Sequence, residues 1–211
     1  MDNSSFEIIK KDLPNFPDEV IKDWIEPYYE KHGWPPKDTW NGVLFNENFE
    51  FWKEVEWKKE TLDLTSIKFS NEWIEVFSSM CFAYTRKNID DTFFGRQLGE
   101  KGRTRWLSPL FYILETGFFP KPICLLCKNN EFSVVDGNHR FMAWQSLAKI
   151  NDELGKLSPE DKLKTLKDLK ISYSKGDASV NDKVSEFSKT QEVLVAYQKN
   201  LTVGNSTTQT L

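Results

Sequence analysis

One stretch, SVVDGNHRFMAW at residues 133–144, constrains the fold of this chain more than any other. A short β-branched run stops at Asp136-Gly137, and a helical pattern begins in the next residue. Glycine permits a tight corner and lets the backbone pass close to whatever lies above it. The first N–H groups of the following helix have no intrahelical partner and carry the positive end of the helix dipole. The stretch therefore predicts a strand, a tight corner and a helix, with room for an anion at the corner.

Two side chains at the start of this predicted helix, His139 and Arg140, favour phosphate as the anion. A forked guanidinium grips phosphate through two parallel hydrogen bonds. A purely structural interpretation stands beside this one: Asp136 caps the helix, His139 is half-buried with its hydrogen bonds satisfied, and Arg140 pairs with a carboxylate. The chain has no Walker lysine motif and no GxGxxG motif, so the phosphate sites of the commonest nucleotide folds are absent. The chemistry of the corner alone leaves both interpretations open.

The hydrophobic pattern around the corner predicts an α+β (α/β) fold. PKPICLLC and FSVV read as the two strands of a hairpin joined by a polar turn at residues 128–131, and EVLVAYQ at 192–198 is one more strand. The helix after the corner extends to about Ile150, and SPEDKLKTLKDL is a second, charged helix. We expect helices packed on a small mixed sheet that includes residues 123–127, 132–135 and 192–198.

The segment before the hairpin predicts a loop and a short helix. Residues 88–105 form a glycine-containing charged connector, which carries the basic residues Arg96, Lys101, Arg103 and Arg105. In SPLFYILETG, Ser108 is a candidate N-cap, Pro109 suits the first helical position and Gly117 ends the helix. A local basic patch of this kind suits a phosphate-bearing ligand, and a solvated loop that happens to be basic is the alternative.

The first ninety residues are rich in tryptophan and predict a mostly helical extension. FPDEVIKDWIEPYYEKHGWPP has helical spacing that opens at Pro17 and stops at Gly33. FEFWKEVEWKK is either helix or loop, TLDLTSIKF alternates as a strand does, and a further helix is expected to start at Ser70. We expect three parts: a helical aromatic-rich extension at 1–90, a domain at 91–200 and a frayed tail at 201–211.

Composition and charge limit the classes of protein and partner. The chain has 211 residues, 39% of them hydrophobic, and no apolar stretch of about 18 residues, so no membrane partner is expected. The amino terminus lacks the apolar core of a signal peptide, which indicates a cytoplasmic protein. Residues 1–60 carry 14 acidic and 8 basic side chains, which disfavours a broad nucleic-acid face. The three cysteines predict neither a disulfide framework nor a metal site, since Cys124 and Cys127 fall on opposite faces of a strand.

The stretch KPICLLCKNNEFSVVDGNHRFMAWQSL resembles the core of the ParB/sulfiredoxin-like superfamily, in which a PI.V strand, a hairpin and a DGxHR, GERR or GCHR box opening a helix are shared. The likeness is strong over residues 122–150 and weaker back to Arg105. The resemblance implies a nucleotide site in which Gly137, Asn138, His139 and Arg140 hold phosphate. A KxxS element of sulfiredoxins, which contributes to ATP binding, is matched by RWLS, and it adds Arg105 and Ser108 to the expected phosphate contacts.

Departures from this family narrow the expected activity. Sulfiredoxins need a cysteine immediately before the box histidine, where this chain has Asn138, so reduction of a sulfinic acid is not expected. Partition proteins follow their box with a long DNA-binding region, whereas about sixty residues remain here. The closest likeness is to free-standing members, some of which are ADP- or ATP-dependent serine kinases and some of which are labelled nucleases.

The sequence therefore predicts a nucleotide-binding phosphotransferase or nucleotide hydrolase. Asp136 is the first candidate for the catalytic carboxylate and Glu115 the second. The resemblance implies a nucleotide (ATP, ADP or CTP) with Mg²⁺, and a small-molecule or protein substrate. Two alternatives are a regulatory protein that binds a nucleotide without chemistry and a ParB-like nuclease; the acidic first third disfavours the nuclease. No resident protein-bound metal site is predicted.

Overall fold

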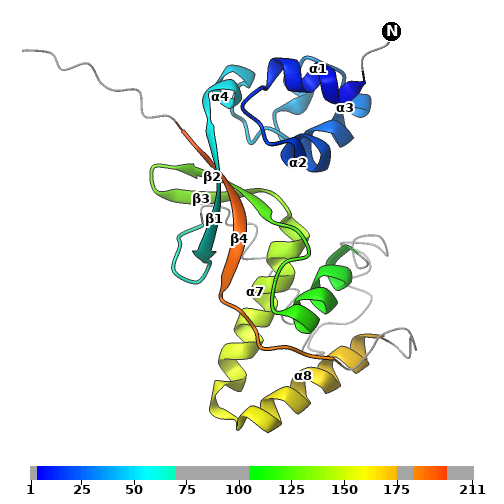
Figure 1. Ribbon diagram of the computed structural model, residues 1–211, viewed down its shortest axis with the longest axis vertical. Coiled ribbons are helices and arrows are strands. Elements are labelled where there is room, and N and C mark those ends of the chain that lie inside the picture. Colours follow the sequence, from blue (N-terminus) through cyan, green and yellow to red (C-terminus); the bar gives the residue numbers. More distant parts are fainter. Residues whose placement is uncertain (1–3, 70–104, 175–182, 199–211) are drawn as a thin grey trace, which may run out of the picture. The chain divides into compact units, whose positions relative to one another are not determined.

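The computed structural model describes residues 4–69, 105–174 and 183–198 (Figure 1). Its helices and strands form an α+β fold with a four-stranded mixed sheet, as the hydrophobic pattern predicts. The helices are α1 (Ser5–Asp12), α2 (Asp18–Val20), α3 (Glu26–His32), α4 (Phe49–Glu54), an unlabelled helix at residues 105–116, α7 (Asn138–Glu153) and α8 (Pro159–Ser174). The strands are β1 (Glu56–Asp63), β2 (Ile123–Lys128), β3 (Glu131–Asp136) and β4 (Thr190–Tyr197).

The chain divides into two compact units. One contains the residues up to Trp57 and the last residues of β4, from Ala196; the other runs from Lys58 to Val195. The expected boundary at residue 90, the helix expected from Ser70 and the tail at 201–211 lie outside the described residues. So do Cys81 and three of the four basic residues of the connector, Arg96, Lys101 and Arg103.

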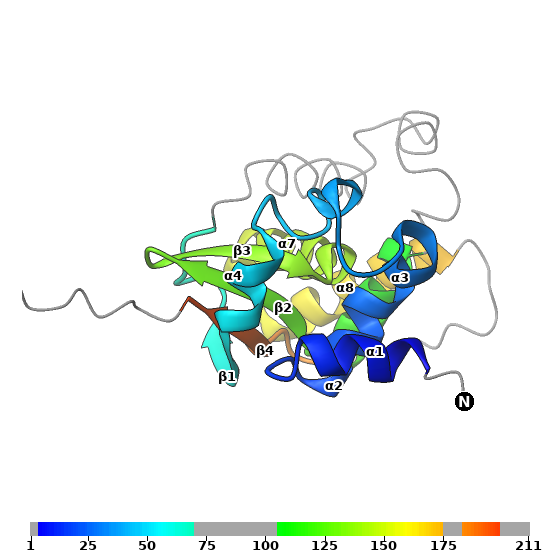
Figure 2. The ribbon, with the colours of Figure 1, turned by 90° about the horizontal axis from the view of Figure 1, so that it is seen from above.

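The first unit is helical and its core is aromatic. Figure 2 shows α1, α2 and α3 near one another. A π-helical segment at Ile21–Ile25 joins α2 and α3 into one continuous helix. The helix predicted between Pro17 and Gly33 is confirmed: it begins after Pro17, and Gly33 ends α3 with φ 76°. Phe16 packs edge-on against Trp52 and Trp57, with ring centroids 6.0 and 5.2 Å away. These tryptophans fill the core, which is the ordinary role of buried aromatic side chains.

The second unit builds the predicted corner on a hairpin. The sheet order is β1-β4-β2-β3, and β2 and β3 pair antiparallel from Lys128↔Glu131 to Cys124↔Asp136. Asn129 and Asn130 both have positive φ, at 54° and 62°, which is the backbone of a two-residue hairpin turn. α7 packs on β2 and β3 with a buried face that includes Phe141, Trp144 and Leu147. The predicted hairpin, the helix after it and the strand at 192–198 are confirmed.

Three local predictions need correction. The strand expected in TLDLTSIKF begins earlier, at Glu56, and ends at Asp63, whose carboxylate accepts from the backbone N–H and the hydroxyl of Thr65 and so forms a turn. FEFWKEVEWKK is neither all helix nor loop, since α4 ends at Glu54 and β1 follows. The helix before the hairpin is already formed at Arg105, so Ser108 lies inside that helix and is not its N-cap.

Candidate phosphate-binding corner

The corner between β3 and α7 is made by Gly137, which has φ 87° and ψ 24° and is the N-cap of α7. No described side chain caps this helix, and its first turn holds no acidic residue. A Cβ placed on Gly137 would lie 2.7 Å from Nη2 of Arg140 and 2.7 Å from Cγ2 of Ile123. Glycine is therefore required both by the left-handed backbone and by the side chains packed against it.

Arg140 folds back over the corner from the first turn of α7. Its Nη2 donates to Oδ2 of Asp136 at 2.8 Å, and the side chains of Arg140 and Asp136 are only 18% and 26% exposed. Asp136 thus orients the guanidinium instead of capping the helix, and the structural alternative in which Arg140 pairs with a carboxylate is correct. The pair also neutralises part of the charge that Arg140 would offer to an anion.

Two polar atoms at the corner are buried without a hydrogen-bond partner among the described residues: Oδ1 of Asn138 and Nε of Arg140. Buried polar atoms in native proteins are nearly always paired with protein, water or ligand. Nε is one of the donors with which arginine binds oxyanions in a bidentate manner. Asp136 fixes the orientation of Arg140 through Nη2, and Nε of the same guanidinium therefore keeps a hydrogen bond to donate at the corner.

The strand that leads into the corner is irregular. Cys124 pairs with Asp136 but Leu125 pairs with Val134, so β3 carries one extra residue, Val135. Val134 and Val135 are both buried, whereas a regular strand alternates its faces. Such a bulge bends a strand and redirects its side chains, and here it turns Asp136 toward α7. The sequence pattern did not predict this bulge or the contact of Ile123 with Gly137. The two adjacent apolar residues Val134 and Val135 were the available signal for the bulge.

His139 lies half-buried beside this ion pair. Burial lowers the pKa of its imidazole, the nearby cations Arg105 and Arg140 lower it further, and Asp136 acts in the opposite direction. Arg105, the first described residue of helix 105–116, is therefore within electrostatic reach of His139. Asp136, His139 and Arg140 lie at the corner, and Arg105 adds a positive charge within electrostatic reach of the imidazole.

The remaining predicted site residues are placed differently. Ser108 lies exposed one turn after Arg105, and no hydrogen bond joins it to the described residues of the corner. Glu115 lies ten residues after Arg105, about 15 Å along a helix. Its Oε1 accepts from Nζ of Lys170 on α8 at 2.7 Å, and its backbone carbonyl accepts from the Ser185 hydroxyl. The structure does not bring Glu115 to the corner and holds it in an ion pair instead.

The described residues contain no group of three or more histidine, cysteine, aspartate or glutamate side chains that could hold a metal ion. Mg²⁺ needs fewer protein ligands, since it commonly binds through one or two carboxylates together with the phosphates of a nucleotide. Asp136 could supply one such ligand, through the oxygen that does not accept from Arg140. Within the described part of the chain, neither Cys124 nor Cys127 forms a disulfide, and burial raises the pKa of the Cys127 thiol. No helix in the described ranges has the length and apolar character to cross a bilayer.

A cavity lies at the other end of α7. It has a volume of about 430 Å³ and is lined by residues from Leu154 to Leu166 and by Ser185, Glu186 and Phe187. Since α7 has 16 residues, this cavity and the corner are separated by about 24 Å of helix. We base the phosphate site on the chemistry of the corner and treat the cavity as a separate feature.

Comparison with models of protein families, with curated protein sequences and with solved structures found no match. The likeness to the ParB/sulfiredoxin-like superfamily therefore depends on the box and hairpin residues themselves.

Proposed function

We propose that the protein binds the phosphates of a nucleotide at the corner between β3 and α7. The observation that carries this proposal is the position of Arg140: its guanidinium lies over Gly137 at the uncapped start of α7, held by Asp136, with Nε buried and unpaired among the described residues. The helix start contributes backbone donors and its positive dipole end. Arg105 and His139 add positive charge and a hydrogen-bonding ring beside it.

The reaction that fits this arrangement is phosphoryl transfer or nucleotide hydrolysis. Such chemistry depends mainly on positioning and on neutralising the phosphate charge, with one carboxylate to orient the nucleophile. Asp136 is the carboxylate at the corner, and Mg²⁺ carried by the nucleotide would share it. The substrate that accepts the phosphoryl group is a small molecule or a protein.

A second candidate, nucleotide binding without chemistry, is favoured by the ion pairs of both proposed carboxylates. Asp136 is held by Arg140 and Glu115 by Lys170, so each carboxylate already has a cationic hydrogen-bond partner within the protein. A regulatory protein would use the same contacts and release no product. Turnover therefore discriminates between the two candidates, whereas binding does not.

The test is calorimetric titration of the purified full chain with ATP, ADP, CTP and GTP in the presence of Mg²⁺. Loss of a charge-assisted contact costs about 1.5–3 kcal/mol, so Arg140→Ala is expected to weaken binding by about tenfold to a hundredfold. Lys156→Ala, which removes an exposed positive charge just beyond α7, is the matched control and should bind normally. Absence of binding to every nucleotide, with or without Mg²⁺, contradicts the proposal.

Asp136→Asn separates binding from chemistry. If the protein is an enzyme, this variant retains nucleotide binding and loses product formation, measured as phosphate release or as transfer to a substrate. Asp168→Asn, an exposed acidic residue on α8, is the control. Full turnover by Asp136→Asn removes this carboxylate from the mechanism, and absence of turnover in the natural protein with every nucleotide and acceptor tried favours the regulatory candidate.

A further inference from the structure

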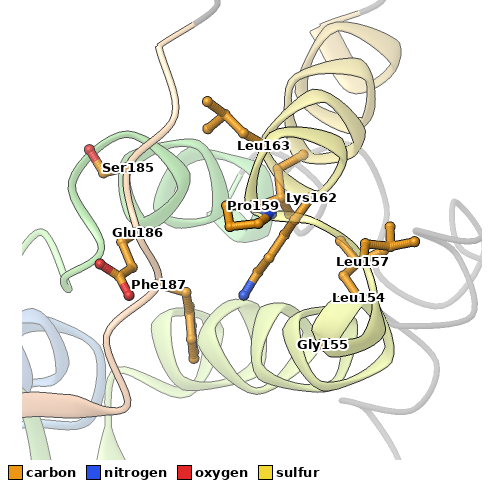
Figure 3. A pocket seen from close by; sticks show the side chains of 10 residues that line it. Leu154, Gly155, Leu157, Pro159, Lys162, Leu163, Ser185, Glu186 and Phe187 are labelled. Atoms are coloured by element: carbon orange, nitrogen blue, oxygen red, sulfur yellow. The ribbon is translucent and has the colours of Figure 1, made fainter.

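The cavity at the far end of α7 has the size and lining of a small-molecule site. Its volume of about 430 Å³ falls within the usual range for ligand pockets. The two buried residues of its lining, Leu154 and Leu166, form an apolar floor where the chain turns from α7 into α8. Phe187 lies in the facing wall (Figure 3).

The segment before β4, which carries Phe187, is held by contacts on both sides of that residue. The backbone N–H of Ser185 donates to the carbonyl of Leu114 at 2.8 Å. Nε1 of Trp144 donates to the carbonyl of Ser188 at 3.1 Å. The wall of the cavity is therefore formed by the fold itself and needs no ligand to hold it in place.

Apolar side chains remain exposed around the cavity. Leu157 is 44% exposed and Leu163 is 41% exposed, on the two sides of the turn into α8. This turn is fixed by Ser158, whose hydroxyl accepts from the backbone N–H of Asp161 at 3.1 Å. Removing apolar surface from water is favourable in proportion to its area, so an apolar group that fits the cavity gains from entering it.

The charge that the cavity presents to a ligand is that of Lys162. Figure 3 shows its side chain reaching from α8 toward α7 across the cavity, whereas the carboxylate of Glu186 lies on the far side of Phe187 from it. Within the described parts of the chain, the ammonium group of Lys162 forms neither an ion pair nor a side-chain hydrogen bond. Apolar walls screen a charge less than water does, so an anion beside this ammonium group is attracted more strongly than one in open solvent.

We propose that this cavity binds a small apolar carboxylate of the class of medium-chain fatty acids. The alkyl chain lies on Leu154, Leu166 and Phe187, and the carboxylate accepts from the ammonium group of Lys162. An apolar amine is repelled by Lys162, and a neutral apolar molecule leaves the ammonium group unpaired. The site is separate from the phosphate-binding corner, so it stands whether or not the corner binds a nucleotide.

The test is titration of the full chain with octanoate, followed by calorimetry or by NMR of the protein. Octanoate is expected to bind in a saturable manner, and acetate, which has the carboxylate without the chain, is not. Octanamide and octylamine keep the chain and lack the negative charge, so both should bind at least about tenfold more weakly. Absence of octanoate binding overturns the site, and equal binding of octanoate and octanamide overturns the recognition of a carboxylate.

Variants locate the site and separate its two parts. Lys162→Met keeps the apolar stem and removes the charge, so it should weaken octanoate binding by about tenfold and leave octanamide binding unchanged. Leu157→Ser removes part of the apolar surface and should weaken the binding of both compounds.

The matched controls are Lys164→Met on α8 and Phe118→Ser, which change an exposed charge and an exposed apolar side chain outside the cavity lining. Neither should alter octanoate binding. The proposal is wrong if Lys162→Met binds octanoate normally, or if it weakens octanamide binding as much as octanoate binding. It is also wrong if the controls weaken octanoate binding as much as the cavity variants do. Unaltered melting temperatures establish that all four variants are folded.

Discussion

Arg140 and Asp136 face each other across the turn made by Gly137. Nη2 of the arginine lies 2.8 Å from Oδ2 of the aspartate, and the guanidinium occupies the volume that a side chain at position 137 would need. The three residues are therefore one structural unit, in which the glycine permits the corner, the aspartate orients the guanidinium and the guanidinium lies over the helix start. This dependence leads to the first prediction.

Gly137→Ala should destabilise the protein and impair anion binding together. The left-handed backbone costs a non-glycine residue about 1–2 kcal/mol, and the new methyl group must also displace Arg140 or Ile123. Urea denaturation measures the stability, and titration with ATP measures the binding. Gly42→Ala is the control, because a Cβ there has nothing within 4 Å and should change the free energy of unfolding little. A stable Gly137→Ala variant with unchanged affinity would show that Arg140 does not need its present position.

His139 should titrate below the usual histidine pKa of about 6.5. Burial and the two arginines favour its neutral form, so NMR of the imidazole should show a low midpoint in the natural protein and a higher one in Arg105→Met. Bound phosphate should also raise the midpoint, since its negative charge favours the imidazolium. A midpoint that does not respond to Arg105→Met would place Arg105 too far from His139 to share a ligand.

The same pKa shift makes stability depend on pH. The unfolded chain protonates His139 at a higher pH than the folded chain does, so the contribution is complete above about pH 6.5 and is lost as the pH falls through the lower, folded pKa. Melting temperatures between pH 7.5 and 5.5 should therefore decline less steeply in His139→Gln than in the natural protein. His32→Gln provides the control with the chain's other histidine.

Glu115→Gln should lower stability because it leaves the ammonium group of Lys170, which is fully buried, without the carboxylate that accepts from it. Removing one member of a buried pair costs about 3–5 kcal/mol, and the 29% exposure of Glu115 reduces the expected loss to about 1–3 kcal/mol. Glu192→Gln, whose partner Lys59 is exposed, should cost less than about 1 kcal/mol. If Glu115→Gln instead abolishes turnover at full stability, Glu115 is a catalytic residue after all.

Trp52→Ala should be among the most destabilising single substitutions in the first unit. The indole is fully buried, packs edge-on against Trp24 with ring centroids 5.0 Å apart and donates from Nε1 to the carbonyl of Leu44 at 3.1 Å. A substitution of this kind costs about 3–5 kcal/mol, measured by chemical denaturation followed by far-UV circular dichroism. Phe118→Ala, at a side chain that is 53% exposed, should stay within about 0.5 kcal/mol. A small effect of Trp52→Ala would mean that the aromatic cluster collapses around the lost ring.

Short-range signals in the sequence were enough to predict the hairpin and the corner. Asn129 and Asn130 tolerate positive φ and therefore form a two-residue turn, and Gly137 ends β3 for the same reason. The apolar spacing of α7 and α8 is local as well, and both helices form where the pattern predicts them. The position of Ser108 was misjudged because Ser-Pro is also typical of a helix start, whereas the described helix already includes Arg105.

The sequence by itself determined the strand, the glycine corner and the polar side chains that follow it, because each depends on φ, ψ and side-chain chemistry within a few residues. Only the tertiary structure decided which side chains meet. It brought Arg105 within electrostatic reach of His139, and it paired Glu115 with Lys170, which is 55 residues away. It also formed the cavity at the end of α7, which is lined by residues of α8 and by residues 185–187. Contacts between distant residues follow from how the helices pack on the sheet, and a local pattern carries no information on that packing.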